Sequence, residues 1–169
     1  MIYNSRRRLQ LKKYITKDDI EYMGNTLFNY YYLRRQEQKY IQESIEIESE
    51  KQIESYNLKN SSCNGIGNGC SVTSPKNASL DRLIKKQIEY DTIASRYKMM
   101  YVNLDKNNDL MKRFKIISVE SQIMINFFYQ RELTIHDIAK IINPSGNISE
   151  QAVRKKLDKA LKEMVGAIR

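Results

Sequence analysis

The side chains best suited to chemistry lie near the carboxyl end of the chain, in the run SEQAVRKKLDKALKEM from Ser149 to Met164. Apolar residues recur there at three- and four-residue steps, which predicts one buried helix face made of Val153, Leu157, Ala160, Leu161 and Met164. At about 100° per residue, the opposite face carries Gln151, Arg154, Lys155 and Asp158. An arginine can form two hydrogen bonds with guanine, a glutamine suits adenine, and a lysine can contact guanine or a phosphate. The pattern therefore favours a helix that recognises the major groove of DNA.

Neighbouring side chains extend this expected interface. Ser149, at the positive end of the helix, is placed to meet a phosphate. Asp158 is expected either to accept from cytosine or to orient Arg154 through an i, i+4 pair. For His136, the sole histidine, a phosphate contact and a plain solvent position both stay open. The complete predicted DNA-binding set is Thr134, His136, Ser149, Glu150, Gln151, Arg154, Lys155, Asp158, Lys159 and Lys162.

The alternative for this surface is the solvated side of an ordinary helix, because charges opposite an apolar stripe are common. The cationic excess of the run, from Arg154 to Lys162, and the helix and turn that precede it favour DNA.

Nothing in the chain indicates an enzyme or a metal protein. One histidine and no activated nucleophile give little from which to build a hydrolase. Cys63 and Cys70 bracket the loop CNGIGNGC, which lacks the four ligands of a structural zinc site. We expect two reduced thiols there, with a disulfide as the alternative. The prediction is no catalytic residue, no metal and no cofactor.

The charge balance agrees with a polyanionic partner. Lys and Arg number 29 against 20 acidic residues, so the formal net charge is +9 and the pI is near 9.4. Such an excess favours nucleic acid, although a merely basic protein would share it. No signal peptide is visible, and no run of 18 apolar residues predicts a membrane span. We therefore expect a cytoplasmic protein.

Two shorter helices are expected to hold the cationic helix in place. In TIHD, Thr134 and Asp137 form a capping box that opens a helix with Ile135, Ile138, Ala139 and Ile142 on one face. The small Ala139 should let that helix and the next cross closely. The polar turn NPSGN follows, and Ser118 should cap an earlier helix that directs Ile123, Met124, Phe127 and Phe128 inward. Residues 116–169 are thus predicted to form a compact three-helix domain.

The remainder of the chain predicts a long helical hairpin. After a basic tail at 1–15, Thr16 and Asp19 form a capping box for a helix that runs to about Leu58. A Gly-rich stretch at 60–78 predicts a mobile loop, and Ser79 should cap a second helix that ends near Leu104. The expected apolar seams contain Ile20, Met23, Leu27, Tyr30 or Tyr31, Ile41 and Ile45 on the first helix, and Leu80, Leu83, Ile84, Ile88, Ile93 or Ala94, Tyr97, Met100 or Tyr101 and Leu104 on the second. The predicted fold is all-α, with a coiled-coil-like hairpin at 16–115.

The hairpin has two interpretations of equal weight. It either mediates contact with a partner, such as homodimerisation, or simply supports the carboxy-terminal domain.

The run from Ile117 to Met164 resembles region 4 of sigma-70-type factors. The family pattern places an apolar helix before "g-x-t-x-x-E-I-A" and "S-x-x-x-V-R-x-x-x-x-K-A-L-x-x-L", which appear here as LTIHDIA (133–139) and SEQAVRKKLDKALKEM (149–164). Asp137 replaces the usual Glu, and the turn NPSGN is about four residues longer than usual. The layout of the whole chain resembles phage sigma-like late-transcription activators of the ArpU/RinA group. The resemblance implies a helix-turn-helix that binds double-stranded DNA in a bacterial cell.

These features together predict a phage or prophage late-gene activator that binds DNA sequence-specifically. One alternative is a sigma-like subunit whose main partner is RNA polymerase, for which the aromatic cluster Tyr30–Tyr32 could serve in promoter melting. The other is a DNA-packaging adaptor resembling a small terminase subunit, which also carries a helix-turn-helix on a helical oligomerisation arm.

Overall fold

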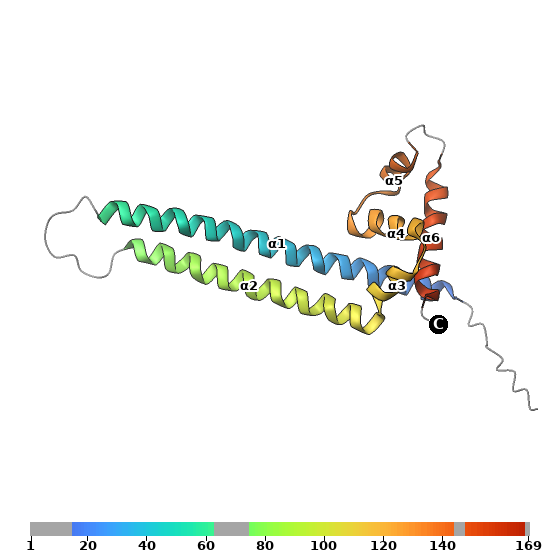
Figure 1. Ribbon diagram of the computed structural model, residues 1–169, viewed down its shortest axis with the longest axis horizontal. Helices are drawn as coiled ribbons and strands as arrows, with labels where there is room; N and C mark the ends of the chain where they lie inside the picture. The colour runs from blue at the N-terminus through green and yellow to red at the C-terminus, as the bar shows by residue number, and fades with distance from the viewer. Residues whose placement is uncertain (1–14, 63–74, 144–147, 168–169) are drawn as a thin grey trace, which may run out of the picture. The chain divides into compact units, whose positions relative to one another are not determined.

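The computed structural model describes residues 15–62, 75–143 and 148–167. The described residues form α1 (Lys17–Ser62), α2 (Pro75–Asn108), α3 (Leu110–Ile116), α4 (Val119–Ile125), a π-helical turn η1 (Asn126–Gln130), α5 (Ile135–Ile142) and α6 (Glu150–Gly166), shown in Figure 1. No strand occurs among them. The all-α prediction is therefore confirmed. The basic tail up to residue 14, both cysteines and most of the NPSGN turn lie outside the described residues.

The chain divides into two compact units. One unit combines residues 1–26 with 111–169, and the other, here called the arm, is 27–110. We expected the division to fall at residue 115 and the whole of α1 to belong to the hairpin. The difference has a local cause at Gly24, where an added Cβ would lie 3.0 Å from Tyr129 Oη and 3.7 Å from Leu161 Cδ1. The first turns of α1 therefore pack within the carboxy-terminal unit.

The start of α1 is set by the predicted capping box. The backbone N–H of Asp19 donates to Thr16 Oγ1 at 3.1 Å, and the backbone N–H of Thr16 donates to Asp19 Oδ2 at 3.0 Å. Both bonds satisfy amide donors that have no partner inside the helix.

The two helices flanking the Gly-rich stretch extend further into it than predicted. α1 continues to Ser62, and α2 begins at Pro75, so Ser79 lies inside α2 and does not cap it. Proline suits the first position of a helix, because its fixed φ is helical and its missing N–H has no intrahelical acceptor there. The predicted loop at 60–78 is thus too long at both ends, and residues 63–74 lie outside the described part.

Within the arm, α1 and α2 run side by side in opposite directions (Figure 1), and their contacts follow a seam with a period of 3.5 residues. Tyr40 stacks on Tyr97 and meets Tyr90 edge-on, with ring centroids 5.8 Å and 5.6 Å apart. On α2, residues turned away from solvent recur at alternating three- and four-residue steps, namely Leu80, Leu83, Gln87, Tyr90, Ala94, Tyr97, Tyr101 and Leu104, and Ile93, Asp105 and Asn108 beside them are also half-buried. On α1 the buried residues of the arm are Leu27, Tyr30, Tyr31, Ser44 and Ile47.

Four isoleucines that we assigned to this seam are exposed. Ile41 and Ile45 on α1 retain 43% and 54% of their surface, and Ile84 and Ile88 on α2 retain 37% and 61%. Polar side chains fill the corresponding seam positions. Ser44 Oγ donates to Asp91 Oδ1 at 2.7 Å, and Lys51 Nζ donates to Glu48 and Gln87 at 2.8 Å each. The prediction ranked positions by hydrophobicity, whereas the seam is set by the 3.5-residue repeat.

The small core of the carboxy-terminal unit lies around α6. α4 and α5 both pack on α6, and η1 joins α4 to the segment before α5. Met124, Ile125 and Tyr129 are buried on the α4–η1 side, while Phe127 and Phe128 are half-buried. Ile123, expected to point inward, is 44% exposed. The π-helical turn that begins at Asn126 adds a residue to one turn, which changes the helix phase after Ile125.

Candidate nucleic-acid interface

The two helices of the candidate interface bury the faces that their sequences predict. On α5, Ile138 and Ala139 are buried and Ile135 and Ile142 are half-buried. On α6, the predicted residues Val153, Leu157, Ala160, Leu161 and Met164 are all buried, and Val165 joins them. These apolar stripes fix the rotation of each helix about its axis. The remaining faces of α5 and α6 are consequently presented to solvent.

Both helices begin with a side-chain cap, which was predicted for α5. For α5, Thr134 Oγ1 accepts from the Asp137 backbone N–H at 3.1 Å, and the Thr134 backbone N–H donates to Asp137 Oδ2 at 3.3 Å. The pKa of Asp137 is below its usual value, and the main cause is the hydrogen bond that its carboxylate accepts from the Thr134 hydroxyl. For α6, Ser149 Oγ accepts from the Ala152 backbone N–H at 3.2 Å. The side chains of Thr134 and Ser149 thus position the helices in this structure.

His136 and Glu150, both in the predicted DNA-binding set, contact each other. His136 Nδ1 lies 3.4 Å from Glu150 Oε1, and the two side chains are 59% and 52% exposed. This contact links the first turn of α5 to the first turn of α6. An exposed pair of this kind adds little stability, so both groups could exchange this contact for another partner.

The outer face of α6 carries the other predicted residues. Gln151, Arg154, Lys155, Asp158 and Lys162 are all exposed. In the part of the chain that the structure describes, no ion pair engages Arg154, Lys155 or Lys162, so the pair with Arg154, one of the two roles considered for Asp158, is not formed. Asp158 instead lies near Tyr129, whose pKa is raised to about 12 by burial first and by the charge of Asp158 second. Three cations are therefore left available on this face.

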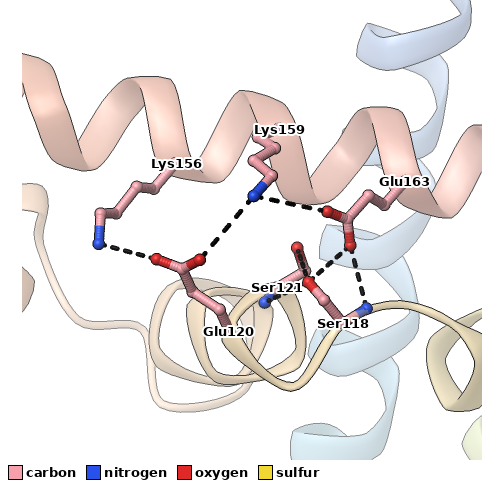
Figure 2. Close-up of polar contacts among 6 residues, drawn as sticks. All are labelled: Ser118, Glu120, Ser121, Lys156, Lys159 and Glu163. Carbon is pink, nitrogen blue, oxygen red and sulfur yellow. Dashed lines mark hydrogen bonds and ion pairs between the residues drawn. The ribbon is translucent and has the colours of Figure 1, made fainter.

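The other two cations of α6 are turned toward α4 and paired, as Figure 2 shows. Lys156 Nζ donates to Glu120 Oε1 at 2.8 Å, and Lys159 Nζ lies 3.9 Å from both Glu120 Oε2 and Glu163 Oε1. The hydrogen bond from Lys156 is the main cause of a lowered pKa at Glu120. Lys159, predicted to contact DNA, is thus partly neutralised by carboxylates of the protein.

The same side of α6 is tied to the start of α4. Glu163 Oε2 accepts from the Ser118 backbone N–H at 3.0 Å and from Ser118 Oγ at 2.8 Å (Figure 2). Burial raises the pKa of Glu163, but the hydrogen bonds from Ser121 and Ser118 outweigh it and the net shift is downward. Ser118 also caps α4 as predicted, because its hydroxyl accepts from the Ser121 backbone N–H.

At the far end of α6, Arg113 Nη1 donates to the carbonyl oxygens of Met164 and Val165 at 3.1 Å and 3.0 Å. A cation at this position satisfies carbonyls that lack intrahelical donors and opposes the negative end of the helix dipole. Arg113, Glu120 and Glu163, which orient α6, were not predicted from the sequence. The only signal for them in the sequence is that each carries a charge that can pair with another polar group.

The chain matches no protein-family model, no curated protein and no solved structure. Within the described ranges, no helix combines the length and apolar character needed to cross a bilayer. No group of three or more His, Cys, Asp or Glu side chains in those ranges is arranged to hold a metal ion.

Proposed function

We propose that this protein is a sequence-specific DNA-binding transcriptional regulator, in which α5 and α6 form a helix-turn-helix and α6 enters the major groove. The observation that carries the proposal is the outer face of α6, where Arg154, Lys155 and Lys162 are exposed and engaged in no ion pair with any described residue. A helix held on one side by a core and carrying available cations on the other is the arrangement that major-groove recognition requires.

The roles of the side chains follow from their positions on α6. Gln151, Arg154 and Lys155 lie in its first two turns, where helices of this class contact base edges. Arg154 is assigned to guanine and Gln151 to adenine. Ser149 and the positive end of α6 are assigned to a phosphate. Lys162, further along the same face, would add a second phosphate contact. Thr134 and His136 lie at the start of α5, where they could meet the same strand.

In biological terms, we propose a phage or prophage late-gene activator. Support comes from the resemblance of residues 117–164 to sigma region 4 together with a net charge of +9. Such a charge gives attraction to DNA of any sequence, while the few base contacts select the site.

The sigma-subunit alternative depends on aromatic side chains that could stack on unpaired bases. Tyr30 and Tyr31 are each only 4% exposed, and Tyr30 packs edge-on against Tyr101 at 5.6 Å. Burial raises the pKa of Tyr31 to about 12. Of this cluster only Tyr32 is exposed, at 44%. The arrangement favours a packing role for the cluster, and promoter-specific transcription with purified core polymerase alone would separate the two functions.

The proposal is tested by selecting bound sequences from a random DNA pool and measuring affinities for the selected site. We expect Arg154→Ala to weaken specific binding by about 1–3 kcal/mol and to relax the preference at one base position. Lys156→Ala is the matched control, because Lys156 lies on the same helix but pairs with Glu120 at 2.8 Å. If Arg154→Ala kept the affinity and sequence preference of the parent, α6 would not be the recognition helix. If the pool yielded no enriched sequence, the proposed function itself would be wrong.

A further inference from the structure

The five cations of α6 fall into two groups that differ in their surroundings. Three are exposed and form no ion pair with any described residue. The other two, Lys156 and Lys159, lie beside the carboxylates of Glu120 and Glu163 (Figure 2). These four side chains carry two positive and two negative charges, so together they are electrically neutral. We call them the charged flank of α6.

The charged flank borders the candidate DNA-binding face. Lys159 is four residues after Lys155 and three before Lys162, and residues at these spacings are neighbours on the surface of a helix. The side chain of Lys159 is 63% exposed, and its Nζ lies 3.9 Å from both Glu120 Oε2 and Glu163 Oε1. Because this distance is too long for a hydrogen bond, the carboxylates attract the ammonium without using its N–H donors. A phosphate on this face of α6 can therefore also approach Lys159.

The two carboxylates of the charged flank differ in what they hold. Glu163 is 28% exposed and accepts hydrogen bonds from the backbone N–H and the hydroxyl of Ser118, so it ties α6 to the start of α4. Glu120 is 53% exposed, and within the described ranges its side chain forms ion pairs and hydrogen bonds only with Lys156 and Lys159. Ion pairs of this exposure add little stability. The main effect of Glu120 is therefore on the charge of the two lysines.

A carboxylate beside Lys159 weakens the attraction of that lysine for DNA. A phosphate paired with Lys159 Nζ at up to about 4 Å would lie within about 8 Å of Glu120 Oε2, which is 3.9 Å from the same nitrogen. This separation is shorter than the Debye length of about 10 Å at 0.1 M salt, so the two anions repel each other. Glu120 therefore offsets part of the phosphate attraction that Lys156 and Lys159 would otherwise supply.

This offset matters most for DNA that lacks the recognition site. Phosphate contacts supply essentially all of the affinity for DNA of arbitrary sequence, whereas base contacts select the site. A chain with a net charge of +9 is attracted to any duplex, and sites of arbitrary sequence far outnumber the specific one. A carboxylate that neutralises lysines at the edge of the recognition helix therefore limits binding at the wrong places.

We propose that Glu120 restrains the binding of α6 to DNA of arbitrary sequence by pairing with Lys156 and Lys159. Because it concerns the same face of α6, this role rests on the proposed function and adds a regulator to it. Replacement of Glu120 by glutamine leaves two lysines and Glu163 in the charged flank, so the flank gains one positive charge. One further phosphate can then be neutralised by α6.

The test compares the affinities of the parent and Glu120→Gln chains for a mixed-sequence duplex that lacks the selected site, at several salt concentrations. One added phosphate should steepen the slope of log affinity against log salt by about 0.9, and should raise the affinity at 0.1 M salt roughly five- to tenfold. Glu120→Ala should give the same gain. Glu89→Gln is the matched control, because it changes the net charge equally but Glu89 is exposed on α2 in the arm. It should leave the slope unchanged.

Two further measurements separate this role from a structural one. Glu120 lies in the first turn of α4, where the helix dipole favours a negative charge. If it served only to stabilise α4, its loss would weaken the domain and lower DNA affinity, which is the opposite sign. In a Lys156→Gln, Lys159→Gln background, Glu120→Gln should no longer steepen the slope, because the lysines through which it acts are absent. Far-UV circular dichroism of each variant establishes that the helices are retained.

The outcomes distinguish this inference from the proposed function. An unchanged or lower affinity of Glu120→Gln for the mixed-sequence duplex would overturn the role of Glu120. An equal gain from Glu89→Gln, or an undiminished gain in the background without the two lysines, would do the same. If the parent still enriches a specific site from the random pool, the proposed function stands without this role. If neither the parent nor Glu120→Gln binds any DNA, both proposals are wrong.

Discussion

In the carboxy-terminal unit, the apolar residues of α6 are the ones that form the core. In the arm, by contrast, some of the large apolar residues lie outside the seam between α1 and α2. Every stripe residue predicted for α6 is buried, but Ile41, Ile45, Ile84 and Ile88 of the arm are exposed beside a seam that contains Ser44 and Lys51. A helix that packs on several neighbours inside one chain must turn its apolar side inward. A helix in a two-helix hairpin has a second side that an external partner can use.

The largest loss of stability is expected when a core residue of the carboxy-terminal unit is truncated. Ile138 on α5 is completely buried, so Ile138→Ala should lower the free energy of unfolding by about 2–5 kcal/mol. Ile141→Ala on the same helix is the control, since Ile141 is 50% exposed and should lose less than about 1 kcal/mol. Denaturant unfolding followed by circular dichroism gives both values. Similar losses for the two variants would show that α5 does not use the face described here.

A smaller effect is expected in the arm from its polar seam. Ser44→Ala removes the hydroxyl that donates to Asp91 at 2.7 Å, and should lower the free energy of unfolding of the arm by about 0.5–1.5 kcal/mol. Asp91→Ala should cost a similar amount, and the double variant no more than either alone. Thermal unfolding of the three variants measures the coupling. Fully additive losses would contradict the hydrogen bond as the source of the effect.

The smallest effect concerns pH and the start of α5. The Thr134 hydroxyl holds the pKa of Asp137 below its ordinary value of 3.8, so the stability from this bond is complete above that value and is lost as pH falls through the lowered pKa. Asp137→Asn should therefore differ most from the parent near pH 5–7 and progressively less below about pH 4. Unfolding midpoints measured at intervals of pH check this. A difference that grew at low pH would reverse the assignment.

Local signals in the sequence predicted the caps at Thr16, Ser118 and Thr134 correctly, because a cap and the amides it serves lie within three residues of each other. Ser79, chosen by the same kind of signal, lies inside α2. The buried face of α6 was also predictable, because its apolar residues repeat every 3.6 residues and so lie on a single side of the helix. The seam of the arm was not predictable, because Ser44 and Lys51 form hydrogen bonds there with Asp91 and Gln87 of α2, which are distant in the sequence.

The candidate interface was predictable to a similar degree. Exposure of Gln151, Arg154 and Lys155 followed from the stripe on the opposite side of α6. The pairing of Lys156 and Lys159 with Glu120 did not, because Glu120 belongs to α4 and no local spacing relates it to α6. The number of basic residues in α6 therefore overestimates how many of them are unpaired and available to bind DNA.

The close approach of Gly24 to Tyr129 and Leu161 has a consequence for biosynthesis. The residues that cover the first turns of α1 are translated more than 100 positions after them. Contacts between such distant segments slow folding, because a long intervening loop must close first. The nascent chain therefore cannot complete the carboxy-terminal unit until α6 has been translated, and a product that stops before α6 would leave that end of α1 without the contact to Leu161.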